Sequence, residues 1–458
     1  MNSISLKQVC SDLFRSTIKK NPMASRVHEI RDPIHGFIKL DSEERKLVNS
    51  RPFQRLRNIH QLALSYLVYP GATHRRFEHS LGVMDVSSRI YDVVTDPENI
   101  YHDSVRQLVP RRGSDYEWSY WRRVLRMAAL CHDMGHLPFS HAAEAALLPE
   151  GVRHEHLSRE IILSAEMQPA FDELKIRPVD VAKLAVGPKY CDGKFSDWES
   201  ILYEVIGGNV FGADRIDYLL RDSYHSGVAY GRFDHNRLIE TMRILPREDQ
   251  ETKEPELGIT RGGLQAAESL LWARYFIYTQ LYFHPVRRIY DIHLKEFLQE
   301  WLEGGRFSTR LEDHLRMTDS EVLTGIDAAA TDPQLKGHRT ASRIANRQHF
   351  RVLYESNPND QTLNLSSVDL VFEAAKKEFG EEALRRDRYT SEAASEDFPV
   401  RLRDGNIASS LTMSTTFSDG QGPRFQVDSV FVAPDGKEKA KIWLSENKAK
   451  ILGEPVNN

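Results

Sequence analysis

A run of apolar residues leads directly into a histidine-rich turn in this 458-residue sequence. Residues 124–131 (VLRMAALC) are typical of a buried helix, and the string CHDMGHLPFSH occupies residues 131–141. Imidazole and carboxylate groups at the end of a buried helix must be hydrogen-bonded or bound to a ligand. The sequence therefore predicts a helix that ends at an internal polar site. Five histidines lie in or near it: His132, His136, His141, His154 and His156.

The rest of the first two thirds of the chain is also helical in pattern. Apolar residues recur at three- and four-residue spacing in six segments, namely 81–94, 124–131, 157–163, 200–206, 215–224 and 264–300. Polar residues with prolines at 95–120 predict an insertion, and the charged stretch 246–258 predicts a loop at the tip of a hairpin. The fold class is therefore expected to be mainly α.

The last hundred residues change in character. Residues 350–354 and 425–432 have the composition of strands, and residues 367–379 have the pattern of a helix between them. Residues 32–40 predict a turn that leads into a short strand. We expect an N-terminal lead-in at 1–25, a helical domain at 26–305, a helical connection at 306–345 and a small α+β region at 346–458.

Composition excludes several classes of protein. The net charge of -5 gives no general attraction to nucleic acid, and three widely spaced cysteines exclude a disulfide framework or a zinc knuckle. The N-terminus has no apolar signal core, and no apolar stretch reaches the length needed to span a membrane. We expect a cytoplasmic protein with no membrane partner, for which nucleic-acid binding is not favoured.

A histidine–aspartate pair alone is weak evidence for a metal site, and the chain contains its own comparison. His102-Asp103 lies in the polar insertion and is expected to be solvated, whereas His132-Asp133 ends an apolar helix. His79 and Asp214 begin two other helical segments and can supply further ligands. Two imidazoles with two carboxylates suit Fe, Mn, Zn, Co or Ni, and Mg less well. Such an ion can activate a water molecule near neutral pH.

The order His79, His132-Asp133, Asp214 resembles the signature of the HD-domain phosphohydrolases. Flanking residues narrow this to the HD-domain deoxynucleoside triphosphate (dNTP) triphosphohydrolases, which include bacterial dGTPases and animal dNTPases that carry a SAM domain. The resemblance is continuous over residues 26–300 and is weakest in the C-terminal third. The similar motifs are DPIHG (32–36), FQRLRNIHQL (53–62), YPGATHRRFEHSLGV (69–83), LCHDMGHLPFSH (130–141), HEH (154–156) and GADRIDYLLRD (212–222).

The resemblance implies a role for each matching residue. The metal would be held by His79, His132, Asp133 and Asp214. The attacking water and the leaving-group proton would be handled by His141 and His154, with Glu144 and Glu155 beside them, and His136 would lie near the phosphates. Arg76 would bind a phosphate oxygen. The sugar and the rest of the nucleotide would be bound by Gln61, Leu62, Tyr218, Asp222, Arg274 and Tyr282.

The activity implied by this resemblance is hydrolysis of a dNTP to a deoxynucleoside and inorganic triphosphate, with a divalent metal ion as cofactor. Alternative substrates for such a site are nucleoside monophosphates, cyclic dinucleotides and single-stranded nucleic acid, and a non-catalytic nucleotide sensor is a third alternative. The sequence does not assign the acid and the base among the histidines.

The resemblance also implies a homo-oligomer, from dimer through tetramer to hexamer, and a nucleotide activator bound between subunits. Arg57 resembles one residue used for guanine nucleotides in relatives, but Asn49 replaces an acidic residue that reads the guanine. Loss of that carboxylate removes an acceptor for the guanine N–H groups. We therefore expect guanine-nucleotide activation to be weak, different or absent.

Several of these residues have simpler explanations. His60 and His74 fit hydrogen-bonded positions in the core, and His35 fits the cap of a turn. His154 and His156 compete for one place in the cleft, and the HE spacing favours His154. Tyr218 also fits the core of a helix.

Overall fold

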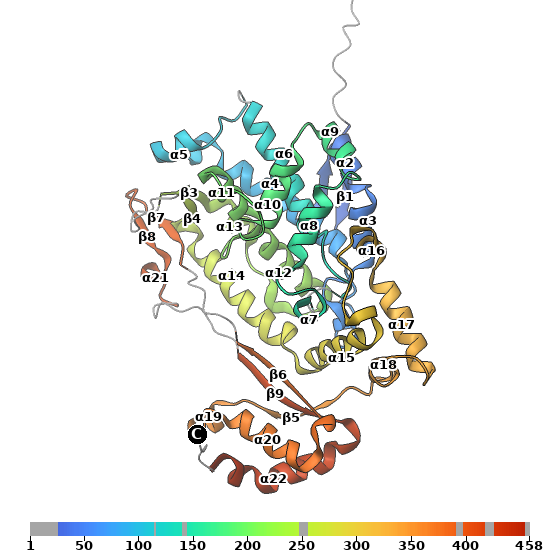
Figure 1. Cartoon of the computed structure of the whole chain (residues 1–458). Helices are drawn as coiled ribbons and strands as arrows, with labels where there is room; N and C mark the ends of the chain where they lie inside the picture. The colour runs from blue at the N-terminus through green and yellow to red at the C-terminus, as the bar shows by residue number, and fades with distance from the viewer. Residues whose placement is uncertain are drawn as a thin grey trace, which may run out of the picture.

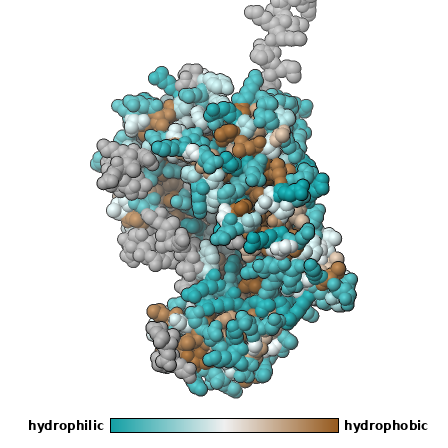
Figure 2. Space-filling view, viewed as in Figure 1, coloured by the Kyte–Doolittle hydropathy of each residue, from teal (hydrophilic) through white to brown (hydrophobic). Residues whose placement is uncertain are grey.

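The protein folds into a helical body with a smaller α+β region at one end (Figure 1). The computed structural model describes residues 26–113, 116–139, 144–246, 255–390, 397–416 and 426–453. Among these residues, no helix is both long enough and apolar enough to cross a membrane. The face in Figure 2 is mostly hydrophilic, with apolar residues scattered in small groups.

The centre of the body is a layer of packed helices that includes α4 (Arg76–Val94), α6 (Tyr116–Cys131) and α12 (Ala213–Ser226). Helix α4 packs against both α6 and α12, and it is buried over most of its surface. The apolar face of α6 begins at Val124 and is fully buried through Cys131, as its periodicity predicts. This packing holds the N-terminal turns of α4 and α12 and the C-terminal end of α6 in fixed positions.

Other helices complete the body. Helices α8 (His154–Ile162), α10 (Pro178–Val186) and α11 (Asp197–Gly207) pack around the central layer. A nearly continuous helical segment follows as α14 (Leu264–Ile277), a π-helical turn (Tyr278–Tyr282) and α15 (Pro285–Trp301). The remaining helices of the body are α2 (Ser42–Val48), α3 (Arg51–Arg55), α5 (Asp103–Leu108), α7 (Glu144–Leu147), α9 (Gln168–Leu174), α13 (His235–Thr241), α16 (Leu311–Arg316), α17 (Asp319–Thr331) and α18 (His338–Ala345).

Two small sheets belong to the helical body. Strands β1 (His28–Asp32) and β2 (Gly36–Leu40) form an antiparallel hairpin in which Asp32 pairs with Gly36. Strands β3 (Met242–Leu245) and β4 (Glu256–Thr260) form a second antiparallel pair. This second sheet is extended by β7 (Pro399–Arg401), which pairs parallel to β4, and by β8 (Ile407–Ser409).

The α+β region is built on a three-stranded antiparallel sheet with the order β5-β9-β6. Its strands are β5 (Arg351–Glu355), β6 (Leu384–Thr390) and β9 (Gln426–Val432). Helices α20 (Ser367–Phe379) and α22 (Lys437–Gly453) pack together on it, and α19 (Pro358–Leu363) is short. The short helix α21 (Ser410–Met413) lies next to β8 in the body. The chain leaves this region after β6, contributes β7 and β8 to the sheet of the body, and returns as β9.

The prediction of a mainly α fold is confirmed. Helix α20 and strand β9 lie where the sequence predicts them, and residues 32–40 form the turn and second strand of the β1-β2 hairpin. The segment 95–120 is more structured than expected, because α5 lies in it and α6 already begins at Tyr116. The aromatic residues of that first turn, with Trp118 against Tyr91 of α4, attach it to the body. The expected lead-in at 1–25 lies outside the described residues.

Candidate metal centre and substrate cavity

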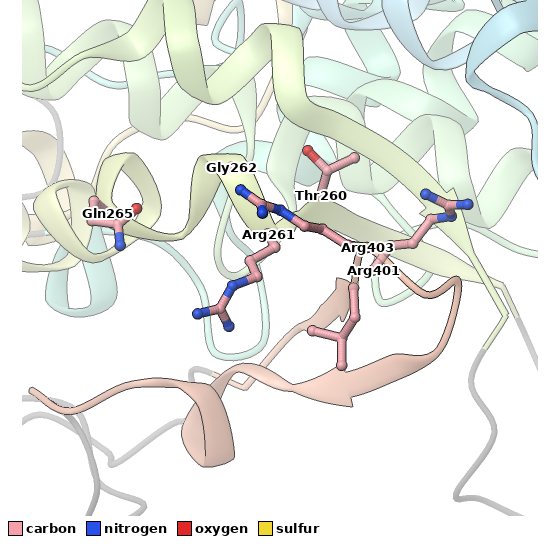
Figure 3. A pocket seen from close by; sticks show the side chains of 7 residues that line it. Thr260, Arg261, Gly262, Gln265, Arg401 and Arg403 are labelled. Carbon is pink, nitrogen blue, oxygen red and sulfur yellow. The ribbon is translucent and has the colours of Figure 1, made fainter.

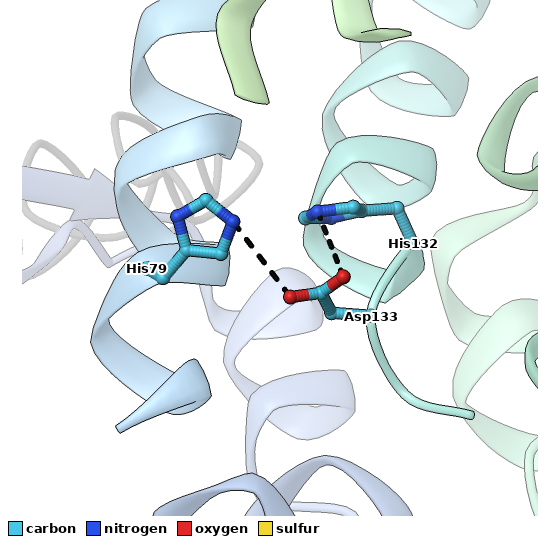
Figure 4. A group of neighbouring side chains, drawn as sticks. All are labelled: His79, His132 and Asp133. Carbon is cyan, nitrogen blue, oxygen red and sulfur yellow. Dashed lines mark ion pairs between the residues drawn. The ribbon is translucent and has the colours of Figure 1, made fainter. Parts of the chain in front are cut away.

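Three helix ends bring four side chains together. His79 lies in the first turn of α4, His132-Asp133 directly follow α6, and Asp214 lies in the first turn of α12. In Figure 4, His79 and His132 point toward the carboxylate of Asp133 from two helices. The Asp133 oxygens lie 3.7 Å from His79 Nε2 and 3.2 Å from His132 Nε2. One oxygen of Asp214 lies 3.0 Å from His79 Nε2 and 3.7 Å from His132 Nε2.

Both imidazoles present the same nitrogen to this centre. His132 Nδ1 lies 2.8 Å from the Ala129 carbonyl oxygen. This hydrogen bond keeps the ring proton on Nδ1, so the lone pair of Nε2 points toward the carboxylates. That Nε2 is buried and has no hydrogen-bond partner among the described residues. His79 Nδ1 is likewise held, at 2.8 Å from Asp217 Oδ2. Metal-binding histidines are oriented in this way, so these residues fit a divalent ion.

Asp217 is a supporting residue that the sequence analysis missed. It is fully buried and accepts hydrogen bonds from His79, from His35 Nε2 at 2.7 Å and from Arg221 at 2.8 and 2.9 Å. Arg221 also contacts Asp32 at 2.8 Å. The His35 side chain therefore contacts the residues that support the site. The turn between β1 and β2 is capped by Asp32, whose carboxylate accepts a hydrogen bond from the His35 backbone N–H. The sequence did contain a signal for Asp217, because Asp217 and Arg221 are four residues apart and can form an ion pair on one helix.

The carboxylates of this centre favour positive charge beside them. Burial alone lowers the pKa of His79, but the hydrogen bonds with Asp214 and Asp217 outweigh it and raise the pKa to about 10. Burial would raise the pKa of Asp133, but Arg76 and His132 hold it well below its usual range. Both aspartates that face the two imidazoles are therefore ionised, because the pKa of Asp214 is lowered too.

A second group of side chains adjoins the first. His136 Nε2 lies 3.2 Å from Asp133, and its ring is stacked 3.8 Å from the ring of His154. His154 Nδ1 lies 3.0 Å from Glu144 and 3.3 Å from Glu155. Burial lowers the pKa of His136 well below its usual value, so this ring is neutral. His141 lies outside the described residues.

His156 does not line the cavity and makes structural contacts instead. Its Nδ1 accepts from the Arg153 backbone N–H at 3.1 Å, and its ring packs edge-on against Tyr190. His60 and His74 are buried and bonded to carboxylates, at 2.6 Å from Asp319 and 2.7 Å from Asp222. His102-Asp103, the comparison pair, is solvated, since the Asp103 side chain is 96% exposed.

Both groups open into one cavity of about 530 Å³. The expected site residues that line it are Gln61, Leu62, Arg76, His79, His132, Asp133, His136, His154, Glu155, Asp214, Tyr218, Asp222 and Tyr282. Glu144 lies behind His154, and Arg274 lies behind Tyr278, with its guanidinium carbon 5.7 Å from that ring centre. The cavity is also lined by residues that the sequence analysis did not predict: Tyr190, Tyr203, Tyr278, Phe283, Arg287, Arg288 and Tyr389.

One face of α12 lines much of this cavity. Asp214, Tyr218 and Asp222 are four residues apart, which places them in a row along the helix. Asp222 accepts a hydrogen bond from Tyr282 Oη at 2.5 Å and contacts His74 on its other oxygen. The row thus begins at the histidine–aspartate centre and ends at a hydrogen-bonded carboxylate.

A second, smaller pocket of about 340 Å³ lies at the start of α14 and beside β7. Arg261, Arg401 and Arg403 line it with Thr260 and Gln265, and their guanidinium groups point in different directions (Figure 3). Three guanidinium groups around one concavity favour an anionic ligand.

Comparison with known proteins agrees with the geometry. Residues 76–185 match the HD domain, and residues 233–381 match the HD associated region. The chain is 32% identical to the uncharacterised protein YwfO of Bacillus subtilis, over 78% of each protein. The chain belongs to the HD-domain phosphohydrolase family. Within the family, a hypothetical protein from Aquifex aeolicus has a similar structure, with a TM-score of 0.74, 30% identity and coverage of 92% of this chain and 100% of that one.

This HD-domain chain is also 29% identical over 72% of its length to human deoxynucleoside triphosphate triphosphohydrolase SAMHD1. It spans only part of some relatives, namely 56% of human SAMHD1 and 57% of an uncharacterised protein from Methanocaldococcus jannaschii, to which it is 37% identical over 65% of its own length.

Proposed function

We propose that the protein hydrolyses dNTPs to deoxynucleosides and inorganic triphosphate with the help of a divalent metal ion. The observation that carries the proposal is the α12 row, in which a carboxylate of the metal centre and the Asp222–Tyr282 pair line the same cavity. Such a cavity suits a ligand with phosphates at one end and a sugar hydroxyl at the other. The similarity to SAMHD1 supports the same substrate class.

The metal would be held by His79, His132, Asp133 and Asp214. A divalent ion there, of which Mn, Fe, Mg, Zn, Co and Ni are the candidates, would neutralise phosphate charge and make a water molecule more acidic. The chain's own residues would do the rest of the work. Arg76 lies beside Asp133 in the cavity and would bind a phosphate oxygen through its guanidinium group.

Proton transfer would fall to the second group of side chains. Glu144 orients His154 through Nδ1, and the His154 ring lines the cavity, where it would act on the water or the leaving oxygen. His136 is neutral and stacked on His154, and burial makes it a weak proton acceptor, so it would form a hydrogen bond near the phosphates. Glu155 and His141, the latter outside the described residues, complete the proposed catalytic set.

The sugar would be bound by Asp222, Tyr282, Tyr218, Gln61 and Leu62. A carboxylate that already accepts from Tyr282 can accept from a sugar hydroxyl as well, since it has more than one lone pair. The Tyr218 and Tyr282 rings, 6.3 Å apart, would pack on the sugar and leave no room for a 2′-hydroxyl. Arg274 would support this wall through Tyr278.

The test is a panel of purified dNTPs and ribonucleoside triphosphates with Mn²⁺ or Mg²⁺, followed by identification of the products. We expect deoxynucleoside and triphosphate from dNTPs and little turnover of ribonucleotides. His132→Ala should abolish turnover without unfolding the chain, whereas Asp103→Asn, at the solvated comparison pair, should not alter it. Release of monophosphate and pyrophosphate would mean that the reaction type is wrong. A nucleoside monophosphate, a cyclic dinucleotide and a labelled oligonucleotide test the alternative substrates.

We also propose the arginine pocket of Arg261, Arg401 and Arg403 as the place of the expected nucleotide activator. Its cationic lining suits the phosphates of a nucleotide, and Asn49, which replaces the acidic guanine reader of relatives, does not line this pocket. Activation should therefore respond to several nucleotides, and Arg401→Ala should reduce it while turnover without activator continues. Stimulation by guanine nucleotides alone would contradict this. Assembly as a dimer, tetramer or hexamer stays a prediction, measurable by light scattering.

A further inference from the structure

The cavity has a wall of aromatic rings that extends well beyond the metal centre. It begins with Tyr218 on α12, next to the centre, and continues through Tyr282 and Tyr278 to Phe283 and Tyr389. Successive ring centres are 6.3, 4.9, 5.6 and 4.7 Å apart. Tyr218, Tyr282 and Tyr278 are half-buried, Phe283 is 8% exposed and Tyr389 is 40% exposed, so the series ends at the surface with Tyr389.

Tyr389 comes from strand β6 of the C-terminal sheet, far along the chain from the other four rings. Alternate residues of a strand face the same side, so Arg385, Asp387 and Tyr389 share one face of β6. All three meet the segment at and before α15: Arg385 contacts Glu296, Asp387 contacts Arg288, and Tyr389 contacts Phe283. The strand is therefore fixed along the helix at three points.

The middle contact sets the position of the last ring. Arg288 donates two hydrogen bonds to the carboxylate of Asp387, at 2.7 and 2.6 Å. Asp387 is only 5% exposed, and paired hydrogen bonds of this kind fix both distance and orientation. Tyr389, two residues further along the strand, is thereby held over Phe283 at the mouth of the cavity.

The arginines at this end are already engaged by the protein. Arg288 is bound to Asp387, and Arg287 donates to Ser65 Oγ at 2.9 Å and to the Tyr282 carbonyl oxygen at 2.5 Å. This end is consequently better suited to a flat, neutral ring system than to a polyphosphate. The phosphates belong at the opposite end, where the histidine–aspartate centre would hold a divalent ion and Arg76 lies beside Asp133.

We propose that Tyr389 and Phe283, the aromatic mouth, form the surface on which the nucleobase of the substrate stacks. The inference rests on the proposed function and adds a specificity-determining residue contributed by the C-terminal region. Every base has a π-face, so stacking on aromatic side chains tolerates any base. The aromatic mouth should therefore strengthen the binding of all four dNTPs while selecting for substrates that carry a base.

The test compares Tyr389→Ala with Tyr389→Phe on each dNTP and on abasic 2-deoxyribose 5′-triphosphate. Loss of the ring should raise KM for every dNTP by roughly tenfold, within the range of base stacking on aromatic residues, and should change kcat much less. Tyr389→Phe should behave like the wild type, because it keeps the ring. The abasic substrate should be hydrolysed equally well by the wild type and Tyr389→Ala. Tyr230→Ala, an exposed tyrosine outside this cavity, is the matched control.

Asp387→Asn tests the positioning of the ring. It weakens the pairing with Arg288, so it should raise KM for dNTPs and leave the abasic substrate unaffected. Equal KM values for Tyr389→Ala and the wild type on dNTPs, or an equal loss on the abasic substrate, would overturn the inference.

Failure of the proposed function can be recognised separately. Equilibrium binding of dATP and of the abasic triphosphate is measured by calorimetry in the His132→Ala background with Mg²⁺. A wild type that hydrolyses no dNTP rejects the proposed function. The stacking inference still holds in that case if Tyr389→Ala weakens binding of dATP alone, and it fails if the change affects both ligands equally or neither of them.

Discussion

At the scale of single residues, the candidate site depends on which nitrogen each imidazole presents. His79 and His132 both turn Nε2 toward the carboxylates because their Nδ1 atoms are held by Asp217 and by the Ala129 carbonyl oxygen. Asp217 does this without lining the cavity, and it is held in turn by Arg221 and His35. Such supporting groups affect metal affinity nearly as much as the ligands do.

Asp217→Asn is the residue-scale prediction. The amide keeps the size of the side chain but loses the charge opposite Arg221, and it accepts more weakly from His79. We expect divalent-metal affinity to fall about 10- to 100-fold, with a lower temperature of unfolding. Metal titration followed by calorimetry and thermal unfolding measure the two effects. Asp103→Asn, whose side chain is 96% exposed, should alter neither. An unchanged metal affinity in Asp217→Asn would show that the orientation of His79 does not depend on Asp217.

At the scale of elements, the decisive contact is between α4 and α12. Gly82 lies inside α4, one turn after His79, where a Cβ atom would stand 1.9 Å from Asp217 Oδ1 and 2.6 Å from Arg221 Nη2. Only glycine lets the two helices approach closely enough for His79 to reach Asp217. The cost to helix propensity is about 1 kcal/mol relative to alanine, so the sequence keeps a poor helix former for the sake of packing.

Gly82→Ala therefore has opposite effects on the helix and on the molecule. The isolated helix would gain stability, but the added methyl group forces α4 and α12 apart. We expect a net destabilisation of about 1–3 kcal/mol and weaker metal binding. Denaturant unfolding with and without metal measures both. Gly453→Ala is the control, because among the described residues no atom outside the backbone of α22 lies within 4 Å of the new methyl group, and it should be neutral or slightly stabilising. Higher stability in Gly82→Ala would contradict the packing argument.

At the scale of the whole molecule, the candidate metal centre connects distant parts of the chain. Its residues come from α4, from the end of α6 and from α12, and the cavity is closed by β6 from the C-terminal region. The unfolded chain cannot hold these groups together, so a bound ion stabilises the folded state alone. The stability added at a metal concentration of 100 times Kd is about 2.7 kcal/mol.

Removal of divalent metal should consequently lower the Tm of the whole protein. Scanning calorimetry after treatment with a chelator, and again after addition of Mn²⁺, measures the loss and the recovery. In His132→Ala the Tm should respond little to either treatment, because one ligand is missing. A metal-dependent Tm of the same size in that variant would place the ion elsewhere in the protein.

The sequence by itself determined the local elements and the order of the four residues that we propose as metal ligands. Periodicity placed α12 and α20, and the apolar run before His132-Asp133 placed the end of α6 beside a polar site, because these patterns reflect burial over a few neighbouring residues. The contrast between His132-Asp133 and His102-Asp103 was likewise readable from their local surroundings.

The tertiary structure alone decided which residues surround that site. The approach of Asp217 and His35 to His79, the passage of β7 and β8 into the sheet of the body, and the arrival of Tyr389 at the cavity all join segments that are far apart in the chain. No local periodicity encodes such contacts, because they depend on how helices and strands pack once formed. The sequence therefore indicated the chemistry of the centre, and the packing of α4, α12, α15 and β6 gave the cavity its shape.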